Sequence, residues 1–352
     1  MMFQWQGSQP VTLRCIDKYR ETDDSVSIKL AARDDTPRFD FKPGQFINLG
    51  VTVASKREFR AYSISSLPQT NYLQLTVKRV NQGRVSNFIV DKLVIGDEVL
   101  ALPPTGNFNC IDHPPMPRSA GTKVLLISAG CGITPVFAMA QHWLTQQPEV
   151  DIAFVHIARS PQATIYFDQL HTLDAAYQQF QLHLLLKHRG DSNCHQGRLD
   201  AAWLQQLVPD LQQRTVYLCG PHQFMQDVQR YLTALAFDMN HFYHESFTPS
   251  ASTTAEVTPQ SAPAAKVSVN IPAFGKQLDV AAGQLLADVL EQAQLPLVIA
   301  CRSGICGSCK CKVNQGKVHS SSQGPLTPAE IEQGYVLACS STIETDLDIN
   351  IG

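Results

Sequence analysis

The sequence predicts a multi-domain α/β plus β protein: an antiparallel β-barrel, then a doubly wound α/β domain, then a smaller C-terminal domain. Short segments of alternating apolar and polar residues fill residues 11–110, which is typical of a small barrel. From about residue 120, continuous apolar runs alternate with helical patterns, as in a doubly wound domain. A stretch rich in Ser, Thr, Pro and Ala follows and has the composition of a mobile linker. We therefore expect domains at residues 1–115, 116–247 and 267–352, with the linker at 248–266.

The composition excludes several classes of function. A chain of 352 residues with 44% hydrophobic and 17% charged residues can build two or three packed cores. Its net charge of −3 gives no general reason to bind nucleic acid or an anionic membrane. No apolar run approaches the roughly 18 residues of a membrane span, and the N-terminus lacks the pattern of a secretion signal. Five of the ten cysteines lie near the C-terminus, which favours a metal site in a reducing compartment, so we expect a cytoplasmic protein.

The spacing of apolar residues also predicts the individual strands and helices. In the barrel, Leu73, Leu75 and Val77 share one face of a half-buried strand. The apolar run at 123–128 indicates a strand buried on both faces of a parallel sheet. Further strands are predicted at 152–158, 180–186, 215–219 (the fourth) and 242–247, and helices at 135–144, 223–236 and 285–294. A capping box at Thr327 with Pro at the first helical position predicts one more helix.

The cysteine cluster is the strongest functional signal. Cys301, Cys306, Cys309 and, thirty residues later, Cys339 have the C-x4-C-x2-C…C spacing of plant-type ferredoxins, whose four thiolates hold a 2Fe–2S cluster. Gly304 and Gly307 allow the tight, positive-φ turns that such a loop needs. Cys311 falls where a strand should resume, so we interpret it as a structural thiol. A zinc site or unligated core cysteines are the alternatives, and zinc is disfavoured because only one CxxC pair is present.

A second pattern, Arg60-Ala-Tyr62-Ser63, lies in the predicted barrel. Its residue types suit a flavin: an Arg can bind a pyrophosphate, an aromatic ring can stack on the isoalloxazine, and a hydroxyl can reach its N5 edge. Downstream, Gly83-Arg-Val-Ser86 lies at a predicted helix start and offers N–H groups and a hydroxyl to phosphates. Taken alone, the Arg60 motif is also compatible with a barrel strand that carries an exposed Arg, and an isolated match of this kind is weak.

Two further turns fall at strand ends of the α/β domain. Gly130-Cys-Gly132-Ile-Thr134-Pro135 follows the first buried strand, and Cys219-Gly220-Pro221 follows the fourth. The first is not the dinucleotide fingerprint GxGxxG, because Pro135 stands where the third glycine should be. In open α/β sheets, ligands bind beyond the carboxyl ends of the strands, so both turns are candidate ligand sites.

Taken together, these motifs resemble the ferredoxin–NAD(P)+ reductase superfamily with a C-terminal plant-type 2Fe–2S ferredoxin domain of the β-grasp fold. The resemblance covers nearly the whole chain and is closest to the hybrid-cluster-protein reductases (NADH oxidoreductases). Reductase components of Rieske-type oxygenases share the layout. The motifs that carry it are RAYSISS, GCGITP, CGP, ESFTP, CRSGICGSCK and LTPAEIEQGYVLACS.

The resemblance implies a role for each matching position. It implies an FAD-binding barrel, an NAD(P)-binding α/β domain and cluster ligands Cys301, Cys306, Cys309 and Cys339. Ser63, Cys219 and Glu245 would be catalytic. The other implied cofactor contacts are Arg60, Tyr62, Ser65, Ser66 and Ser86 for FAD; Gly130, Gly132, Thr134 and Gly220 near the nicotinamide; Arg159 and Ser160 near the adenosine ribose; and Phe247 near the flavin.

A hydride site, a flavin and a cluster in one chain predict conversion of a two-electron donor into single electrons for a partner protein. We expect NADH rather than NADPH as donor, although Arg159, Ser160, His188, Arg189 and Arg198 are candidates for holding a 2′-phosphate. A hybrid-cluster protein is the first candidate acceptor, and an oxygenase component the second. A cluster-based redox sensor and a flavin reductase for small acceptors are the alternatives of other classes. We assign no metal role to the pairs His241/His244 and Cys194/His195.

Overall fold

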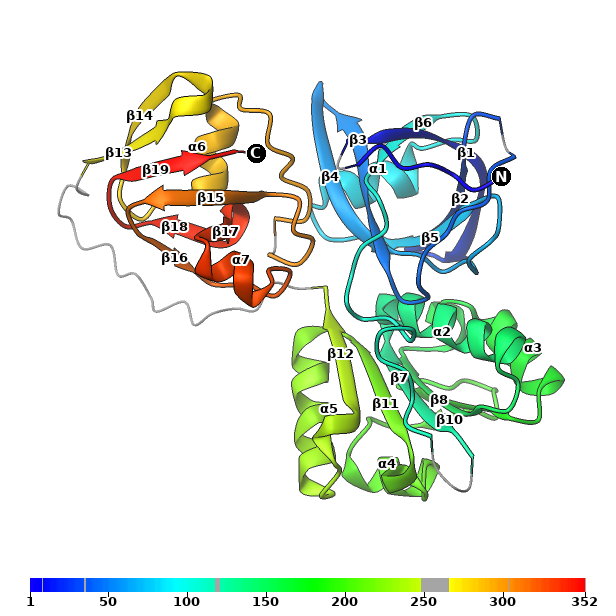
Figure 1. Ribbon diagram of the computed structural model, residues 1–352. Helices are drawn as coiled ribbons and strands as arrows, with labels where there is room; N and C mark the ends of the chain where they lie inside the picture. The colour runs from blue at the N-terminus through cyan, green and yellow to red at the C-terminus, as the bar shows by residue number, and fades with distance from the viewer. Residues whose placement is uncertain (8, 35, 118–120, 248–265, 303, 352) are drawn as a thin grey trace. The chain divides into compact units, whose positions relative to one another are not determined.

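The computed structural model describes residues 1–7, 9–34, 36–117, 121–247, 266–302 and 304–351. The chain divides into two compact units: the first contains the α/β domain and the barrel except for Glu58–Ala61, and the second contains the C-terminal domain together with Glu58–Ala61 (Figure 1). The predicted linker lies outside the described residues except for Lys266, which already belongs to a strand. No helix in the described ranges is long and apolar enough to cross a membrane.

The N-terminal domain is an antiparallel sheet of six strands in the order β4-β3-β6-β1-β2-β5. A bridge between Ile64 and Leu75 joins the end of β4 to β5 and closes the sheet into a barrel, as predicted. Leu73, Leu75 and Val77 are fully buried in its core, which confirms the predicted face. The elements are β1 (Val11–Thr22), β2 (Ser25–Ala31), β3 (Phe46–Val53), β4 (Lys56–Ser63), β5 (Leu73–Lys78), α1 (Arg84–Asp91) and β6 (Glu98–Ala101).

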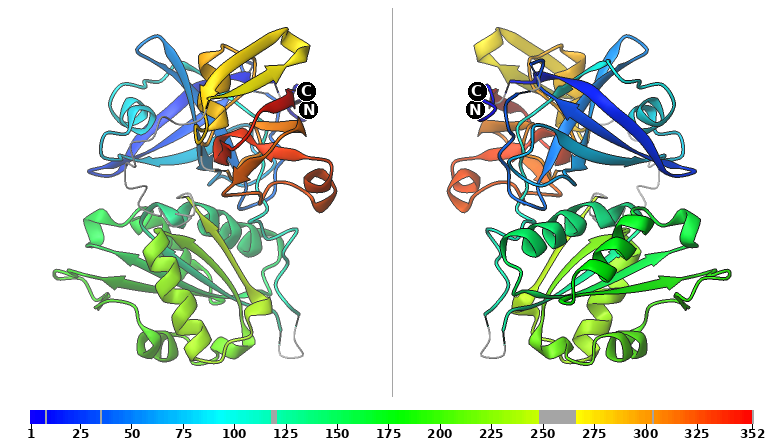
Figure 2. Two further views of the ribbon diagram at one scale, coloured as in Figure 1. Left: turned by 90° about the vertical axis from the view of Figure 1, so that its left-hand side faces the viewer. Right: turned by 90° about the vertical axis from the view of Figure 1, so that its right-hand side faces the viewer.

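The second domain is a parallel sheet in the order β10-β9-β8-β7-β11-β12, with helices on both faces (Figures 1 and 2). One core contains apolar residues of α2 and α3, and the other those of α4 and α5. The strands are β7 (Lys123–Ala129), β8 (Asp151–Ala158), β9 (Phe180–Leu186), β10 (His195–Gln196), β11 (Thr215–Gly220) and β12 (Phe242–Ser246). The helices are α2 (Ile133–Gln146), α3 (Phe167–Ala176), α4 (Ala201–Leu207) and α5 (His222–Ala234).

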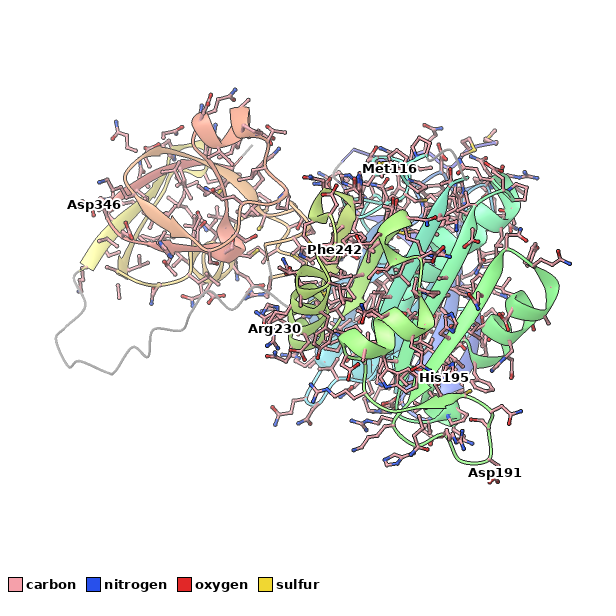
Figure 3. The ribbon with its side chains drawn as sticks, turned by 90° about the horizontal axis from the view of Figure 1, so that it is seen from below. Met116, Asp191, His195, Arg230, Phe242 and Asp346 are labelled. Atoms are coloured by element: carbon pink, nitrogen blue, oxygen red, sulfur yellow. The ribbon has the colours of Figure 1, made fainter. Side chains whose placement is uncertain are left out.

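Two details of this sheet correct the sequence prediction. The strand at Thr215 is the fifth in chain order rather than the fourth, because the two-residue strand β10 precedes it. Strand β10 forms one edge of the sheet, where Figure 3 labels His195 of this strand and Asp191 of the loop before it. Strand β12 ends at Ser246, so Phe247 lies beyond it and is 41% exposed. Neither difference leaves a signal in the sequence, since β10 carries no apolar run.

The topology produces one switch point. From β7 the chain builds outward through β8 and β9 on one side, whereas β11 and β12 lie on the other side. The carboxyl ends of the adjacent strands β7 and β11 therefore flank the position where such folds bind ligands. The Gly130 and Gly220 turns both lie there.

The C-terminal domain is a mixed five-stranded sheet in the order β14-β13-β19-β15-β17, with a two-stranded β16-β18 pair. Helix α6 packs its buried face into the core of this sheet, which is the predicted β-grasp arrangement. The capping box at Thr327 is formed as predicted. The elements are β13 (Lys266–Ile271), β14 (Lys276–Ala281), α6 (Leu286–Gln292), β15 (Lys310–Gln315), β16 (Val318–Ser320), α7 (Pro328–Glu332), β17 (Tyr335–Leu337), β18 (Ser341–Ile343) and β19 (Leu347–Asn350).

Candidate active site and metal centre

The turn after β7 is packed tightly against the end of β11. A Cβ atom on Gly132 would come within 2.3 Å of the carbonyl oxygen of Cys219, so only glycine fits there. Gly130 has a φ of 54°, a conformation that glycine adopts freely. Thr134, in the first turn of α2, is buried, and its hydroxyl donates to the carbonyl of Cys131 at 3.0 Å. The structure thus brings the predicted GCGITP and CGP turns together at the switch point.

A row of polar side chains crosses four neighbouring strands near their carboxyl ends. His156, Ser128, Cys219 and Glu245 are successive register partners on β8, β7, β11 and β12. Register partners in a parallel sheet point to the same face, so the four side chains lie on one side of the sheet. The row joins the predicted residues Cys219 and Glu245 to two that sequence reasoning missed, His156 and Ser128.

The electrostatics of the row are dominated by burial. Desolvation raises the pKa of Glu245 to about 8 and raises the pKa of Cys219 well above its ordinary value. Burial also lowers the pKa of His156 to about 3, so this imidazole is neutral at pH 7. Its Nδ1 lies 2.8 Å from the Ser128 hydroxyl, whereas its Nε2 and the Oε2 of Glu245 are buried without a hydrogen-bond partner in the described part of the chain. A protonated Glu245 would have a proton to donate to a bound group.

In the barrel, residues 60–66 include the last part of β4 and continue beyond its end at Ser63. The Ser63 hydroxyl is buried, and no partner for it is found among the described residues. Tyr62 is half-buried and packs against the barrel core. The Arg60 guanidinium is 39% exposed and contacts the carboxylate of Glu58 at 3.4 Å. A buried hydroxyl without a partner beside an aromatic ring and an accessible cation fits a polar ligand such as a flavin.

The next two hydroxyls of the motif have partners within the protein. Ser65 donates to the carbonyl of Gln74 at 3.2 Å. Ser66 donates to the carbonyl of Tyr72 at 3.4 Å and accepts from the amide of Gln74 at 3.1 Å. Both hydroxyls therefore help to close the barrel between β4 and β5, and their contact with a flavin stays a prediction.

The remaining predicted cofactor contacts lie at element ends. Ser86 lies in the first turn of α1, buried, with its hydroxyl accepting from the Val80 amide at 3.4 Å. Arg159 is exposed and Ser160 half-buried, directly after β8. The loop after β9 pairs with this segment, since the His188 amide donates to the Arg159 carbonyl at 2.8 Å.

The four predicted cluster cysteines are gathered in the C-terminal domain. Cys301 interacts with the thiols of both Cys306 and Cys339, and Cys309 also interacts with Cys339. No three metal-ligating side chains converge on one point in the part of the chain that the structure describes, so the case for a cluster rests on these contacts and on the spacing. Cys311 is buried in β15, with a pKa raised to about 12 by burial, as expected of a structural thiol.

Backbone N–H groups donate hydrogen bonds to two of these sulfurs. The amide of Gly304 donates to Cys339 Sγ at 3.3 Å, and the amide of Cys339 donates to Cys309 Sγ at 3.4 Å. Gly304 and Gly307 have φ values of 71° and 74°, the positive-φ turns that the sequence predicts. Thiolates that hold an iron–sulfur cluster are stabilised by such N–H donors, so these residues fit a 2Fe–2S group.

Comparisons with known proteins agree with this organisation. Three family profiles match: an oxidoreductase FAD-binding domain over residues 12–110, an oxidoreductase NAD-binding domain over 126–230 and a 2Fe–2S iron–sulfur cluster binding domain over 270–344. The glycine betaine monooxygenase reductase subunit of Pseudomonas aeruginosa is 33% identical, with 96% of this chain and 94% of the relative covered. NADH oxidoreductase HCR of Escherichia coli is 34% identical, with 93% and 94% covered.

Solved structures share the fold. Phthalate dioxygenase reductase superposes with a TM-score of 0.63 at 22% identity, over 97% of this chain and 98% of that one. The FAD/NAD-binding domain of a nitric oxide dioxygenase from Vibrio cholerae gives a TM-score of 0.61 at 28% identity, over 68% and 98%.

Fold, site and comparisons define an iron–sulfur flavoprotein oxidoreductase that uses NADH, FAD and a 2Fe–2S cluster. The relatives that match over the whole chain are named as reductases and an oxidoreductase, which supports an enzyme over a redox sensor. The chain belongs to the ferredoxin–NAD(P)+ reductase family whose members carry a C-terminal 2Fe–2S ferredoxin domain.

Proposed function

We propose that this reductase takes electrons from NADH and delivers them one at a time to a separate iron-containing protein. The observation that carries the proposal is a pair of buried polar atoms, Ser63 Oγ and Glu245 Oε2, that have no partner among the described residues, in a chain whose four predicted cluster thiols also contact one another in pairs. When bound, the flavin supplies the step between a two-electron donor and a one-electron acceptor.

On the barrel side, this chain's residues bind and orient the flavin. The exposed guanidinium of Arg60 would bind the pyrophosphate, and Ser86 with the first turn of α1 would add a hydroxyl and N–H donors. Tyr62 would stack on the ring system, and the Ser63 hydroxyl, which has no partner in the described ranges, would bond its N5 edge.

On the α/β side, close packing shapes the nicotinamide site. A Cβ on Gly130 would meet no atom within 4 Å, so the ring would lie in the open space beside it, whereas Gly132 lets the turn pack directly against Cys219, whose thiol is buried and protonated. Gly220 likewise permits close packing within the protein, because a Cβ there would lie 2.8 Å from the Phe224 ring. Thr134 holds the turn in shape through its bond to the Cys131 carbonyl.

Glu245 would hold a proton near the flavin, because its carboxyl is neutral in the folded chain near pH 7. The exposed Phe247 would cover the site from the end of β12. Arg159 and Ser160 would bind the adenosine ribose beyond the end of β8. A cytoplasmic location stays a prediction from cysteine usage.

Cys339→Ala tests the order of electron flow. The variant should lose the visible and EPR signals of the cluster, while the rate of dye reduction by NADH stays within about twofold of wild type. Cys311→Ala is the matched control, since it removes a buried thiol of the same domain that is not a predicted ligand. If Cys339→Ala without a cluster still reduced the natural partner at the normal rate, the cluster would not lie on the path.

For the acceptor we propose a hybrid-cluster protein, supported by the similarity to NADH oxidoreductase HCR. An oxygenase component is the second candidate, and the similarity to the glycine betaine monooxygenase reductase subunit supports it equally. Purified candidates of both kinds should be mixed with the NADH-reduced enzyme and followed by stopped-flow absorbance. Rapid, saturable reoxidation by the hybrid-cluster protein alone is the expected result. Reoxidation by the oxygenase component alone would replace the first candidate with the second.

A further inference from the structure

Tyr166 occupies an unusual position between the two domains of the first unit. It precedes α3 with a φ of 62°, a left-handed conformation that is unfavourable for a residue with a side chain. The side chain is 1% exposed, and its ring stacks on Phe137 of α2 with centroids 4.4 Å apart. Surrounding contacts must hold a residue in such a conformation, so its orientation is well determined.

The hydroxyl of Tyr166 leaves the α/β domain and enters the barrel. It forms a short hydrogen bond with the hydroxyl of Thr76 on β5. Thr76 lies 2.7 Å from the hydroxyl of Ser27 on β2, and Ser27 donates to the carboxyl of Glu21 at 2.5 Å. An ionised carboxylate only accepts, so an ionised Glu21 fixes the direction of the whole chain: Tyr166 donates to Thr76, and Thr76 donates to Ser27.

The same residue of β5 receives a second contact from the α/β domain. The thiol of Cys131, in the GCGITP turn, donates to the carbonyl of Thr76 at 3.5 Å. Tyr166 also lies within hydrogen-bonding reach of Ser65, in the segment that follows the proposed flavin residue Ser63. The Tyr166 hydroxyl therefore joins the α/β domain to strand β5 and to the proposed flavin motif, and the GCGITP turn contacts the same residue of β5 through Cys131.

We propose that Tyr166 is a positioning residue for hydride transfer: by tying the α/β domain to Thr76, it sets the approach of the nicotinamide to the flavin. The inference rests on the proposed function. In that step a hydride would pass from the nicotinamide to the flavin, so that NADH would be oxidised to NAD+ and the flavin reduced by the same two electrons. Small displacements of reacting groups cost large factors in rate, and a hydroxyl that fixes the relative position of the two domains acts on that distance.

The test is Tyr166→Phe in the full-length holoenzyme. The ring and its stacking on Phe137 are kept, and only the hydroxyl is lost. Anaerobic stopped-flow should show flavin reduction by NADH slowed about tenfold to a hundredfold. The deuterium isotope effect with 4-deuterated NADH should change, and the charge-transfer band between flavin and nicotinamide should weaken. Partner-independent properties, namely the flavin and cluster spectra, should be unchanged.

Tyr217→Phe is the matched control. Tyr217 is another fully buried tyrosine of the α/β domain, and its hydroxyl donates to the carbonyl of His113 at 2.6 Å, away from the Thr76 contact. It should lower the melting temperature about as much as Tyr166→Phe but leave the hydride rate and isotope effect unchanged. Thr76→Val should reproduce the effect of Tyr166→Phe, and the double variant should be no slower than either single one.

Three results would each contradict the positioning role of Tyr166. A normal rate and isotope effect in Tyr166→Phe would overturn the inference and leave the proposed function intact. An equal slowing in Tyr217→Phe would also overturn it, because the effect would then be general loosening. If NADH did not reduce the flavin of the wild-type enzyme, the proposed function would fail and the inference with it.

Discussion

Individual residues of the candidate site have properties that their neighbours impose. Glu245 belongs to a parallel edge strand, and the packing around its carboxyl removes water from one oxygen, for which the described residues supply no donor. Such an acid keeps its proton to higher pH because the charged form has lost its hydration. A charged residue at the end of a strand pattern is visible in the sequence, but the loss of hydration depends on the fold.

Glu245 gives a prediction about stability and pH. Its pKa in the folded chain, about 8, lies above the ordinary value of 4.5, so the folded state keeps a proton that the unfolded state releases. This contribution to the free energy of unfolding is complete below pH 4.5, falls as pH rises by up to about 1.4 kcal/mol per unit, and is lost above pH 8. Glu245→Gln should flatten this decline in urea unfolding followed by tryptophan fluorescence.

The exposed Glu149→Gln serves as control, since its side chain stays in water in both states. Parallel pH profiles for wild type and Glu245→Gln would contradict the assignment of a neutral carboxyl with one buried oxygen at this position.

Several partners of single residues could not be foreseen. Ser128 and His156 stand in apolar runs, which signals buried polar groups, yet their pairing at 2.8 Å depends on the register of β7 against β8. Tyr166 carries no sequence signal, because its partner Thr76 is ninety residues away on another domain. Long-range polar contacts of this kind follow from the tertiary structure and not from local periodicity.

At the scale of elements, local patterns predicted most of what is seen. Strand β9 occupies the predicted residues, and β7 and β8 differ by one residue at one end. These strands are rich in buried apolar residues, so their signal needs no tertiary information. The capping box of α7 could also be predicted from neighbouring residues alone. The closure of the barrel could not, because it depends on one bridge between distant strands and on the hydroxyls of Ser65 and Ser66.

The cluster loop is fixed to α6 by Arg302, which lies beside the predicted ligand Cys301. Its guanidinium contacts the carboxylates of Asp288 at 2.8 Å and Glu291 at 2.5 Å. Arg302 also has a φ of 55°, the left-handed region that favours glycine. The ion pairs therefore hold a backbone conformation that the residue does not favour by itself.

Two substitutions separate these effects. Arg302→Ala loses both ion pairs and keeps the unfavourable backbone, whereas Arg302→Gly loses the ion pairs and relieves the backbone. We expect denaturant to remove the cluster from Arg302→Ala most easily, with Arg302→Gly more resistant by about 1 kcal/mol. The visible band of the cluster, followed against urea concentration in the full chain, measures this. A glycine variant less resistant than the alanine variant would show that the backbone strain is unimportant.

At the scale of the whole molecule, the sequence order of the modules carries the functional conclusion. A barrel, a doubly wound domain and a ferredoxin domain each occur in many proteins, and each motif alone is weak. Their succession in one chain is matched over 96% of its length by the glycine betaine monooxygenase reductase subunit. The comparisons do not identify the acceptor, because of two relatives with nearly equal identity one is named as a monooxygenase reductase subunit and the other only as an NADH oxidoreductase. Partner choice depends on surface residues that no local pattern marks.

The central claim is that electrons from NADH reach both the flavin and the cluster of this chain. An anaerobic titration of the holoenzyme with NADH, followed by visible absorption and EPR, tests it most directly. We predict that the flavin and cluster bands bleach together and that the EPR signal of a reduced 2Fe–2S cluster appears. Bleaching of the flavin with an unchanged, EPR-silent cluster would contradict the account, because the two centres would then not exchange electrons.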